Sequence, residues 1–320
     1  MLPIKSYVAN PTKLGSAIVK HFGQWLPDSV YLKLRYRMLM GRRLNLKNPR
    51  TFQEKLQWLK LHDRNPEYTK MVDKILVKEY VASIIGKEYV IPLLGVWDRA
   101  EDIEWDVLPN QFVLKTNHSG GNTGVVICKD ISSFDRQSAI AKLNASLAYD
   151  IFKDFREWPY KDVERKVFAE EYIEPATKET WGIRLTQSGE RIFSASDLLD
   201  YKFFCFNGIV KFFKIDFDRL TNHHANYYDR EGRILPFGEL DYLPIPNKQI
   251  DIPLNLQEMI KLAEKLSKDK KFVRIDFYNI KNKIYFGEIT FYPASGFGKF
   301  EPKEWDWIVG KMLDLHRKKG

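Results

Sequence analysis

Alternating apolar and polar positions near the C-terminus predict a β-hairpin. Residues 273–278 and 284–290 are rich in β-branched and aromatic side chains, and the short polar segment 280–283 separates them. Successive side chains of a strand point to opposite faces, so residues two apart share a face. We therefore expect Arg274, Asp276 and Tyr278 on one face of the first strand, and Glu288 and Thr290 together on the second.

Two acids of this hairpin are expected to face each other. A loop centred on Asn282 places Asp276 directly opposite Glu288. Like charges in that position destabilise a sheet unless something lies between them. Two carboxylates and the hydroxyl of Thr290 are hard oxygen ligands, which suit Mg²⁺ together with nucleotide phosphates. The pattern predicts a metal site at Asp276, Glu288 and Thr290, and an exposed strand face with unrelated charges is the alternative.

Helical periodicity dominates the first part of the chain. Residues 31–43 interleave apolar residues with five cations, as in a solvated helix face or in a helix that faces a membrane or a partner. Residues 51–54 form a capping-box signature that opens a helix to about Leu61. A second helix is expected over residues 66–85, ending near Gly86.

Strand patterns dominate the rest of the chain. Asn207-Gly208 lies between two apolar runs, which is a strong hairpin signal. A helix is expected near residues 135–150, and another starts at Asn255. The second helix has a buried stripe formed by Leu256, Ile260, Ala263 and Leu266. The expected strands are a buried strand at 90–97, then 112–117, 125–128, 167–173, 200–206 and 209–216. The pattern predicts an α+β fold of mostly antiparallel sheets covered by helices.

Composition narrows the class of protein. The chain has 320 residues, of which 44% are hydrophobic and 29% charged, enough for a core divided between two or three lobes. No apolar run approaches the roughly 18 residues that cross a bilayer, and residues 1–10 lack the apolar core of a signal peptide. Cys128 and Cys205 are isolated in apolar segments, which excludes a disulfide framework and a cysteine-based zinc site. We therefore expect a cytoplasmic protein.

The net charge points to anionic partners. It is +9, with a pI of about 9.2, which favours nucleotides, acidic sugars, nucleic acid or an anionic membrane surface. No recognised nucleic-acid motif accompanies the charge, so nucleic acid is not an expected partner. Peripheral attachment to the inner face of the membrane through the basic N-terminal helices stays open.

A lysine followed by a glycine-rich turn is a candidate phosphate site. Lys115 ends an apolar strand, and the turn 119–124 follows four residues later. Glycines let backbone amides approach a phosphate, and a lysine adds a positive charge, although most such turns only connect strands. The spacing is neither that of a Walker A loop nor that of a dinucleotide-binding fingerprint. His118 beside the turn could contact phosphate or cap the turn.

The order of the motifs resembles the ATP-grasp superfamily, in which two sheet-bearing lobes clamp ATP. Along the chain come Asp73-Lys74, Lys115 with its turn, residues 170–173, Arg274-x-Asp276, and Glu288-x-Thr290 followed by residues 293–296. In the carboxylate–amine ligases of that superfamily, the matching lysines bind phosphate, the paired acids bind Mg²⁺, and the arginine stabilises the oxyanion. One departure is Thr290, which stands where asparagine is usual and weakens a second metal site.

This resemblance implies a set of site residues. Adenine would lie against the backbone of residues 171–173, with Glu174 near the ribose. The residues expected at ATP are Lys74, Lys115, Ser119, Gly120, Gly121, Glu171, Tyr172, Ile173, Glu174 and Lys202. The expected catalytic residues are Arg274, Lys115 and Lys202, and the expected metal ligands are Asp276, Glu288 and Thr290.

Over residues 45–310 the chain resembles the TupA-like branch, which is encoded with bacterial surface-polysaccharide genes. The motifs that carry this likeness are residues 48–58, Asp73-Lys74, 112–115, 200–208, which include Asp200 and Lys202, and 285–293. The resemblance implies a helical N-terminal region over residues 1–99, a small lobe with a glycine-rich lid over 100–175 and a large lobe with the metal site over 176–320. It also implies an ATP- and Mg²⁺-dependent ligase that joins an amino acid or other amine to a uronic acid of a capsular or cell-surface polysaccharide.

Two other functions stay open at this point. One is a glycosyltransferase or other sugar-transfer enzyme, although no nucleotide-sugar motif stands out. The other is a non-catalytic module that binds anionic polysaccharide or the membrane. Arg184 and Arg219 are candidate anchors for a substrate carboxylate, and His223-His224 is a weak metal candidate because further ligands are lacking.

Overall fold

Helices and strands of the chain build an α+β structure in the computed structural model. The residues that it describes are 11–121, 123–174, 199–217, 223–248, 250 and 252–316. The helices are α2 (Pro11–Phe22), α3 (Asp28–Met40), α4 (Phe52–His62), α5 (Glu67–Val72), α6 (Leu76–Ile85), α7 (Arg136–Leu147), α8 (Ile151–Phe155), α9 (Leu256–Ser267) and α10 (Trp305–Met312).

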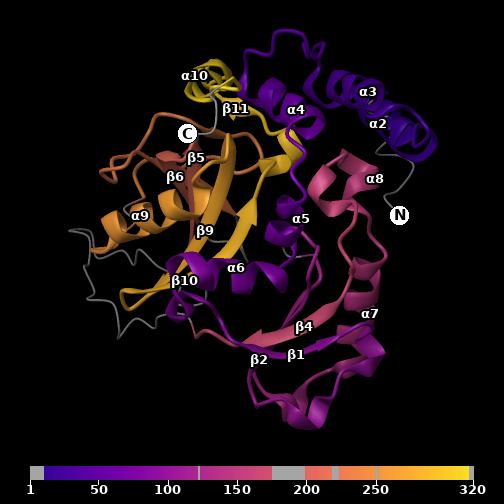
Figure 1. Ribbon diagram of the computed structural model, residues 1–320, viewed down its shortest axis with the longest axis vertical. Coiled ribbons are helices and arrows are strands. Elements are labelled where there is room, and N and C mark those ends of the chain that lie inside the picture. The colour runs from indigo at the N-terminus through magenta and orange to yellow at the C-terminus, as the bar shows by residue number, and fades with distance from the viewer. Residues whose placement is uncertain are drawn as a thin grey trace.

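Antiparallel pairing joins the strands. One sheet has the order β1-β4-β2-β3, from Leu93–Trp97, Val167–Glu171, Phe112–Thr116 and Val125–Cys128. The larger sheet has the order β10-β9-β5-β6-β7, from Lys283–Thr290, Phe272–Ile280, Asp200–Phe206, Ile209–Phe217 and His224–Tyr228. The short strands β8 (Gly238–Glu239) and β11 (Phe300–Glu301) pair with each other. Figure 1 shows the two larger sheets at different heights along the molecule, with α5 and α6 between them. The division at residues 99 and 175 stays a prediction.

The predicted capping box opens α4. The side chain of Thr51 accepts a hydrogen bond from the Glu54 amide at 3.3 Å, and Glu54 Oε2 accepts one from the Thr51 amide at 3.2 Å. Both contacts satisfy amide groups that a helix start leaves without a partner. The same helix packs against α10, since Asp306 Oδ1 accepts from the Gln53 amide at 3.0 Å.

The helix predicted over residues 66–85 is wrong in one respect, because it is broken at Asp73. Asp73 Oδ1 accepts hydrogen bonds from the amides of Ile75 and Leu76, at 2.8 and 3.2 Å. The Lys74 amide donates to the Asn117 carbonyl at 2.9 Å, which diverts the backbone away from the axis of α5. Because the break joins this connection to the end of β2, it carries Lys74 toward the small sheet. Gly86 ends α6, as predicted.

The strand predicted at residues 90–97 forms, but the prediction that it is buried is wrong. Its regular part is β1, which pairs only with β4 at the edge of the small sheet among the described strands. Leu93 and Val96 are exposed, whereas Trp97 is buried. An apolar run cannot by itself distinguish a central strand from an edge strand.

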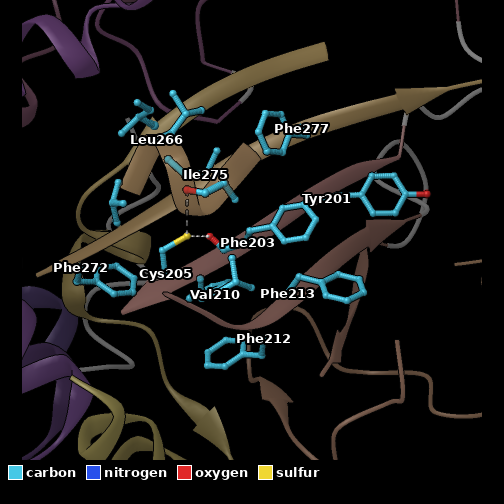
Figure 2. Packing of buried hydrophobic residues seen from close by; sticks show 14 of the residues in the cluster. Tyr201, Phe203, Cys205, Val210, Phe212, Phe213, Leu266, Phe272, Ile275 and Phe277 are labelled. Atoms are coloured by element: carbon cyan, nitrogen blue, oxygen red, sulfur yellow. Dashed lines mark hydrogen bonds between the residues drawn. The ribbon is translucent and has the colours of Figure 1, made fainter. Parts of the chain in front are cut away.

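The aromatic core of the molecule lies on the large sheet. Every residue of β5 is buried, and Phe204 stacks on Phe212 of β6 with ring centroids 4.7 Å apart. On the opposite face, Cys205 packs toward α9, and its Sγ donates to the carbonyls of Phe203 and Ala263 (Figure 2). Both cysteines are free and buried, so the predicted absence of a disulfide framework holds for them.

The C-terminal hairpin has the predicted pairing, produced in an unexpected way. A two-residue turn, Lys281-Asn282, has positive φ at both positions, so Phe286 pairs with Phe277. Continued without a break, that register would put Gly287 opposite Asp276. A bulge between Phe286 and Glu288 shifts the register by one residue, and Glu288 then pairs with Asp276 and Thr290 with Arg274.

Membrane-spanning helices are absent from the part of the chain that the structure describes, where no helix is both long and apolar enough.

We expect the substitution Gly310→Ala to lower stability, because Gly310 lies where α10 meets the start of α4. An added Cβ would lie 2.3 Å from the Arg50 carbonyl oxygen and 2.9 Å from the Phe52 amide nitrogen. Neither backbone atom can rotate away, so the free energy of unfolding should fall by about 2–3 kcal/mol. Denaturant titration measures it. Gly120→Ala is the control, since a Cβ there meets nothing within 4 Å, and equal effects of the two substitutions would refute the prediction.

Candidate functional site

Arg274 connects the two acids of the hairpin. Its Nε donates to Asp276 Oδ1 at 2.7 Å, and its Nη2 donates to Asp276 Oδ2 at 2.7 Å. The same Nη2 reaches Glu288 Oε1 at 2.9 Å and Thr290 Oγ1 at 3.1 Å. The guanidinium therefore lies between the carboxylates whose repulsion would otherwise weaken the strand pair.

This arrangement tests whether the predicted metal ligands fit a cation. Oxygens of Asp276, Glu288 and Thr290 all converge on one atom, Arg274 Nη2. Their distances of 2.7–3.1 Å exceed the roughly 2.1 Å of a Mg²⁺–oxygen bond, so a small inward movement would be needed. Among the described residues, no group of three or more His, Cys, Asp and Glu side chains could hold a metal ion. These residues therefore fit Mg²⁺ only if the guanidinium of Arg274 moves aside. The Thr290 hydroxyl or a phosphate oxygen of the nucleotide would then complete the coordination of the metal.

Lys202 is the second cation beside this hairpin. It projects from β5 opposite Asp276, and its Nζ lies 3.0 Å from Asp276 Oδ2 and 3.5 Å from Asp216 Oδ2. Asp200 is a further hydrogen-bond partner. Burial alone would lower the pKa of Lys202, but these three acids raise it above its ordinary value, so the ammonium stays charged.

Lys74 reaches the acids from the other side. The break between α5 and α6 places its Nζ at the Ser119 carbonyl and 3.7 Å from Glu288 Oε2. Burial lowers the pKa of Lys74, and the charge of Glu288 offsets this effect only in part. For Glu288 the cations prevail over burial: Lys74 and Arg274 lower its pKa to about 2.

Lys115 projects from β2 of the small sheet and is paired with Glu170 of β4. Glu170 also accepts from Lys78 Nζ at 2.8 Å. Burial opposes the charge on Lys115, but Glu170, Tyr278 and Glu288 raise its pKa. Lys115 therefore interacts electrostatically with the hairpin of the large sheet.

The structure thus brings seven predicted residues together at one site. The lysines arrive from three elements, the α5–α6 connection, β2 and β5, and the acids from β9 and β10. These residues are Lys74, Lys115, Lys202, Arg274, Asp276, Glu288 and Thr290. Their roles in binding and catalysis stay predictions.

Other predicted nucleotide residues lie at the edges of this site. Ser119 is buried and holds Lys74 through its carbonyl, whereas Gly120 and Gly121 are exposed. At the end of β4, Glu171 and Glu174 are exposed, and Tyr172 and Ile173 are half-buried. The predicted adenine and ribose contacts of residues 171–174 stay predictions.

The histidine and arginine candidates are less central. His118 Nε2 lies 3.2 Å from the Tyr149 carbonyl, and burial lowers its pKa to about 4, so a structural role accounts for this histidine. His223 Nε2 lies 3.5 Å from Asp216 Oδ1, while His224 Nδ1 lies 2.7 Å from the Leu243 carbonyl, so the neighbouring histidines have different partners. Arg184 and Arg219 lie outside the described residues.

Several charged residues of the site were not among the predictions. Lys214 and Asp216 of β6 lie on the same side of the sheet as Lys202, and Lys214 Nζ is 3.2 Å from Glu239 Oε2. Counting back from the Asn207-Gly208 turn without a break would pair Lys202 with Phe213. A bulge between Phe204 and Cys205 shifts the register and pairs Lys202 with Lys214, so this part also needed the structure. Glu170 and Lys78 needed the tertiary structure, because nothing in their local sequence distinguishes them from surface charges.

Comparisons with known proteins identify the class. The family model described as TupA-like ATPgrasp matches residues 54–314. The chain therefore belongs to the TupA-like ATP-grasp family. The predicted ATP-grasp fold and branch are confirmed, and with them the predicted class of ATP-dependent enzyme with ATP as its cofactor. No curated protein matches the chain.

Solved structures give weaker likenesses. D-alanine–D-alanine ligase of Helicobacter pylori is 14% identical with a TM-score of 0.42, over 82% of this chain and 69% of that one. The Bacillus anthracis D-alanine–D-alanine ligase is 15% identical with a TM-score of 0.41, over 76% and 66%. The ADP complex of N5-carboxyaminoimidazole ribonucleotide synthetase is 12% identical with a TM-score of 0.42, over 74% and 50%. Likenesses at this level assign no residue roles to this chain.

The low pKa of Glu288 predicts a pH-dependent contribution to stability. An acid whose pKa is lower in the folded state stabilises the fold above its ordinary pKa and loses that contribution as the pH falls. The difference in unfolding free energy between wild type and Glu288→Gln should therefore shrink between about pH 5 and pH 2. Denaturant titrations across this range measure the difference. In a Lys74→Met background this difference should depend less on pH. A difference between wild type and Glu288→Gln that stays constant over this pH range would contradict the ion pairing.

The position of Arg274 predicts competition with a metal ion. Since its Nη2 occupies the point where three ligand oxygens converge, Arg274→Met should tighten Mn²⁺ binding to the free protein by roughly tenfold, as the carboxylates lose their bound cation. Calorimetry with Mn²⁺ at pH 8 measures this affinity. Asp276→Asn should remove binding, and weaker Mn²⁺ binding by Arg274→Met would refute the competition.

Proposed function

We propose that the protein is an ATP- and Mg²⁺-dependent carboxylate–amine ligase that forms an amide between an amino acid, or another amine, and a uronic acid of a bacterial capsular or cell-surface polysaccharide. The γ-phosphoryl group of ATP passes to the carboxylate, giving an acyl phosphate and ADP. The amine then attacks the acyl carbon, and phosphate leaves as the amide forms. Both steps conserve the atoms of ATP, acid and amine.

One observation carries this proposal: lysines from two distant elements and two carboxylates from one hairpin lie around the same point. Lys74 Nζ lies 3.7 Å from Glu288 Oε2. The charge of Glu288 also raises the pKa of Lys115. Phosphoryl transfer needs positive charge around the phosphates and acids that hold a metal ion. A cluster of this composition, in a member of the TupA-like ATP-grasp family, supports that reaction.

Each side chain has a distinct task in the proposal. Lys74 and Lys115 neutralise phosphate charge, and Lys202 holds the transferred group beside Asp276. Bound at Asp276, Glu288 and Thr290, Mg²⁺ would supply charge neutralisation at the phosphates. Arg274, released from the acids, would stabilise the oxyanion that develops when the amine attacks.

The glycine-rich turn is proposed as a lid. Gly120 and Gly121 are exposed, and Gly121 has a φ of +59°, which favours glycine. Closure of this turn over the phosphates would exclude water from the acyl phosphate and so prevent its hydrolysis. Ser119 would follow the movement, because its carbonyl accepts from Lys74.

The substrate assignment rests on chemistry and on the branch. An acid activated as an acyl phosphate must present a free carboxylate, which uronic acids do. The resemblance to the TupA-like branch implies a role in the synthesis of surface polysaccharides. Amide formation at a uronic acid satisfies both conditions, whereas no residue pattern favours transfer from a nucleotide sugar.

We expect ADP release to require Mg²⁺, an amine and a uronic-acid acceptor together. Incubation with an amino-acid panel, followed by mass spectrometry, should show a product lighter by one water than the sum of acid and amine. Lys115→Met and Glu288→Gln should each lower kcat/KM by about a hundredfold or more, since the first removes a positive charge at the reacting phosphate and the second removes a proposed metal ligand.

The matched control for these variants is Lys142→Met, which removes an exposed lysine of α7. Its kcat/KM should stay close to that of wild type. Turnover that survives in the double variant Lys115→Met/Glu288→Gln would overturn the proposed site. Thermal stabilisation by nucleotide sugars but not by ATP would instead favour a sugar-transfer enzyme.

A further inference from the structure

The positive charge of the chain is concentrated at one end. Residues 1–50 contain ten Lys and Arg and a single acid, Asp28, whereas residues 51–320 contain 41 Lys and Arg and 41 Asp and Glu. The whole net charge of +9 therefore resides in the first fifty residues. The family match begins at residue 54, so this basic segment lies outside the part of the chain that the ATP-grasp family model matches.

The helix α2 exposes an apolar stripe on the side away from the protein. Leu14, Ile18 and Phe22 recur every four residues and are exposed, so they share one face. Ser16 on the opposite face is buried. Trp25 follows in the connection to α3 and is 81% exposed, and Phe22 is 76% exposed. Large aromatic side chains in such positions have no contribution to make to the core.

The outward face of α3 combines apolar and cationic residues. Tyr31, Leu32, Arg35 and Tyr36 are buried, which places Val30, Lys33, Leu34 and Arg37 on the exposed side, where all four lie. Further exposed cations follow helix α3 at Arg43, Lys47 and Arg50. Among the residues that the structure describes, none of these five exposed cations forms an ion pair with an acid.

The other charges of this segment fasten it to the rest of the molecule. Asp154 of α8 forms two ion pairs with this segment. Its Oδ1 lies 3.0 Å from Arg35 Nη2, and its Oδ2 lies 2.6 Å from Lys20 Nζ. The single acid of the segment, Asp28, is bound by Arg64 at 2.6 Å and by Arg156 at 3.2 Å. Figure 1 shows α2 and α3 beside α8 at one end of the molecule. The pair is therefore held in a fixed orientation, with its apolar and cationic faces outward.

We propose that the outward faces of α2 and α3 form a docking surface for an anionic phospholipid bilayer. Aromatic and aliphatic side chains enter the boundary between headgroups and acyl chains, and the unpaired cations contact lipid phosphates. Charge complementarity selects this occupant: the surface is strongly basic, and its one acid is already neutralised by two arginines. A protein partner would need matching acids and an apolar groove, whereas a bilayer supplies both anionic charge and an apolar interior.

Co-sedimentation of the full chain with vesicles tests the proposal. Vesicles of phosphatidylcholine with about one third phosphatidylglycerol should bind the protein, and pure phosphatidylcholine should bind it far less. Raising the salt from about 0.1 to 0.5 M should weaken the binding, since the Debye length shortens. Absence of binding to the anionic vesicles at low salt would overturn the proposal.

Two variants separate the apolar and the cationic contributions. Phe22→Ser/Trp25→Ser should lower the partition coefficient by about tenfold or more, and Lys33→Gln/Arg37→Gln/Arg43→Gln by roughly a hundredfold at low salt. Their controls are Ile127→Ser/Leu254→Ser, which removes exposed apolar residues elsewhere, and Lys299→Gln/Lys303→Gln/Lys311→Gln, which removes exposed cations elsewhere. Variants and controls that bind equally would refute the assigned surface.

Two further measurements separate lipid binding from a purely structural role of these helices and from self-association. ATP turnover with soluble substrates should be unchanged in both surface variants, because the substituted residues are outside the site; a loss of activity together with folding stability would show that the helices are structural instead. Light scattering measures the mass in solution. Self-association that disappears in Phe22→Ser/Trp25→Ser, without any vesicle binding by the wild type, would assign the surface to a second copy of the chain and overturn the lipid proposal.

Discussion

Repulsion between Asp276 and Glu288 is the constraint around which the site is organised. Two carboxylates on neighbouring strands of a buried sheet need a cation between them. In this structure Arg274 fulfils that need, with Lys202 and Lys74 on either side. The cations hold the pKa of Glu288 low, whereas burial raises the pKa of Asp276. The arrangement also means that the residues proposed for metal binding and for oxyanion stabilisation are in contact with one another.

The same constraint explains how residues from two sheets can form one site. Lys74 depends on the break at Asp73, and Lys115 depends on its ion pair with Glu170 in the small sheet. Each lysine is half-buried, so a nearby acid helps it to remain charged. Lys115 has Glu170 of its own sheet, whereas Lys74 relies on Glu288 of the large sheet. A lysine that is shared in this way ties the position of one sheet to the other.

The molecule therefore separates two uses of positive charge. In residues 51–320 the charges of opposite sign are equal in number, and the site uses buried or half-buried cations that are closely paired with acids. In residues 1–50 the cations are in excess, and Lys33, Arg37, Arg43, Lys47 and Arg50, which form no ion pair among the described residues, are exposed. The first use suits recognition of a triphosphate at close range, and the second suits a broad anionic surface, because exposed charges act over a Debye length and need no fitted partner.

Local sequence determined the elements and most of the site residues. Thr51 and Glu54 opened α4, Asn207-Gly208 turned β5 into β6, and alternation put Arg274 and Asp276 on one face, because capping, turn conformation and strand periodicity depend on near neighbours. Only the tertiary structure decided the break at Asp73, the edge position of β1, the bulge before Glu288 and the pairing of Lys115 with Glu170. Each of these depends on a contact between segments distant in the sequence, such as Lys74 with Asn117, which short-range patterns do not encode.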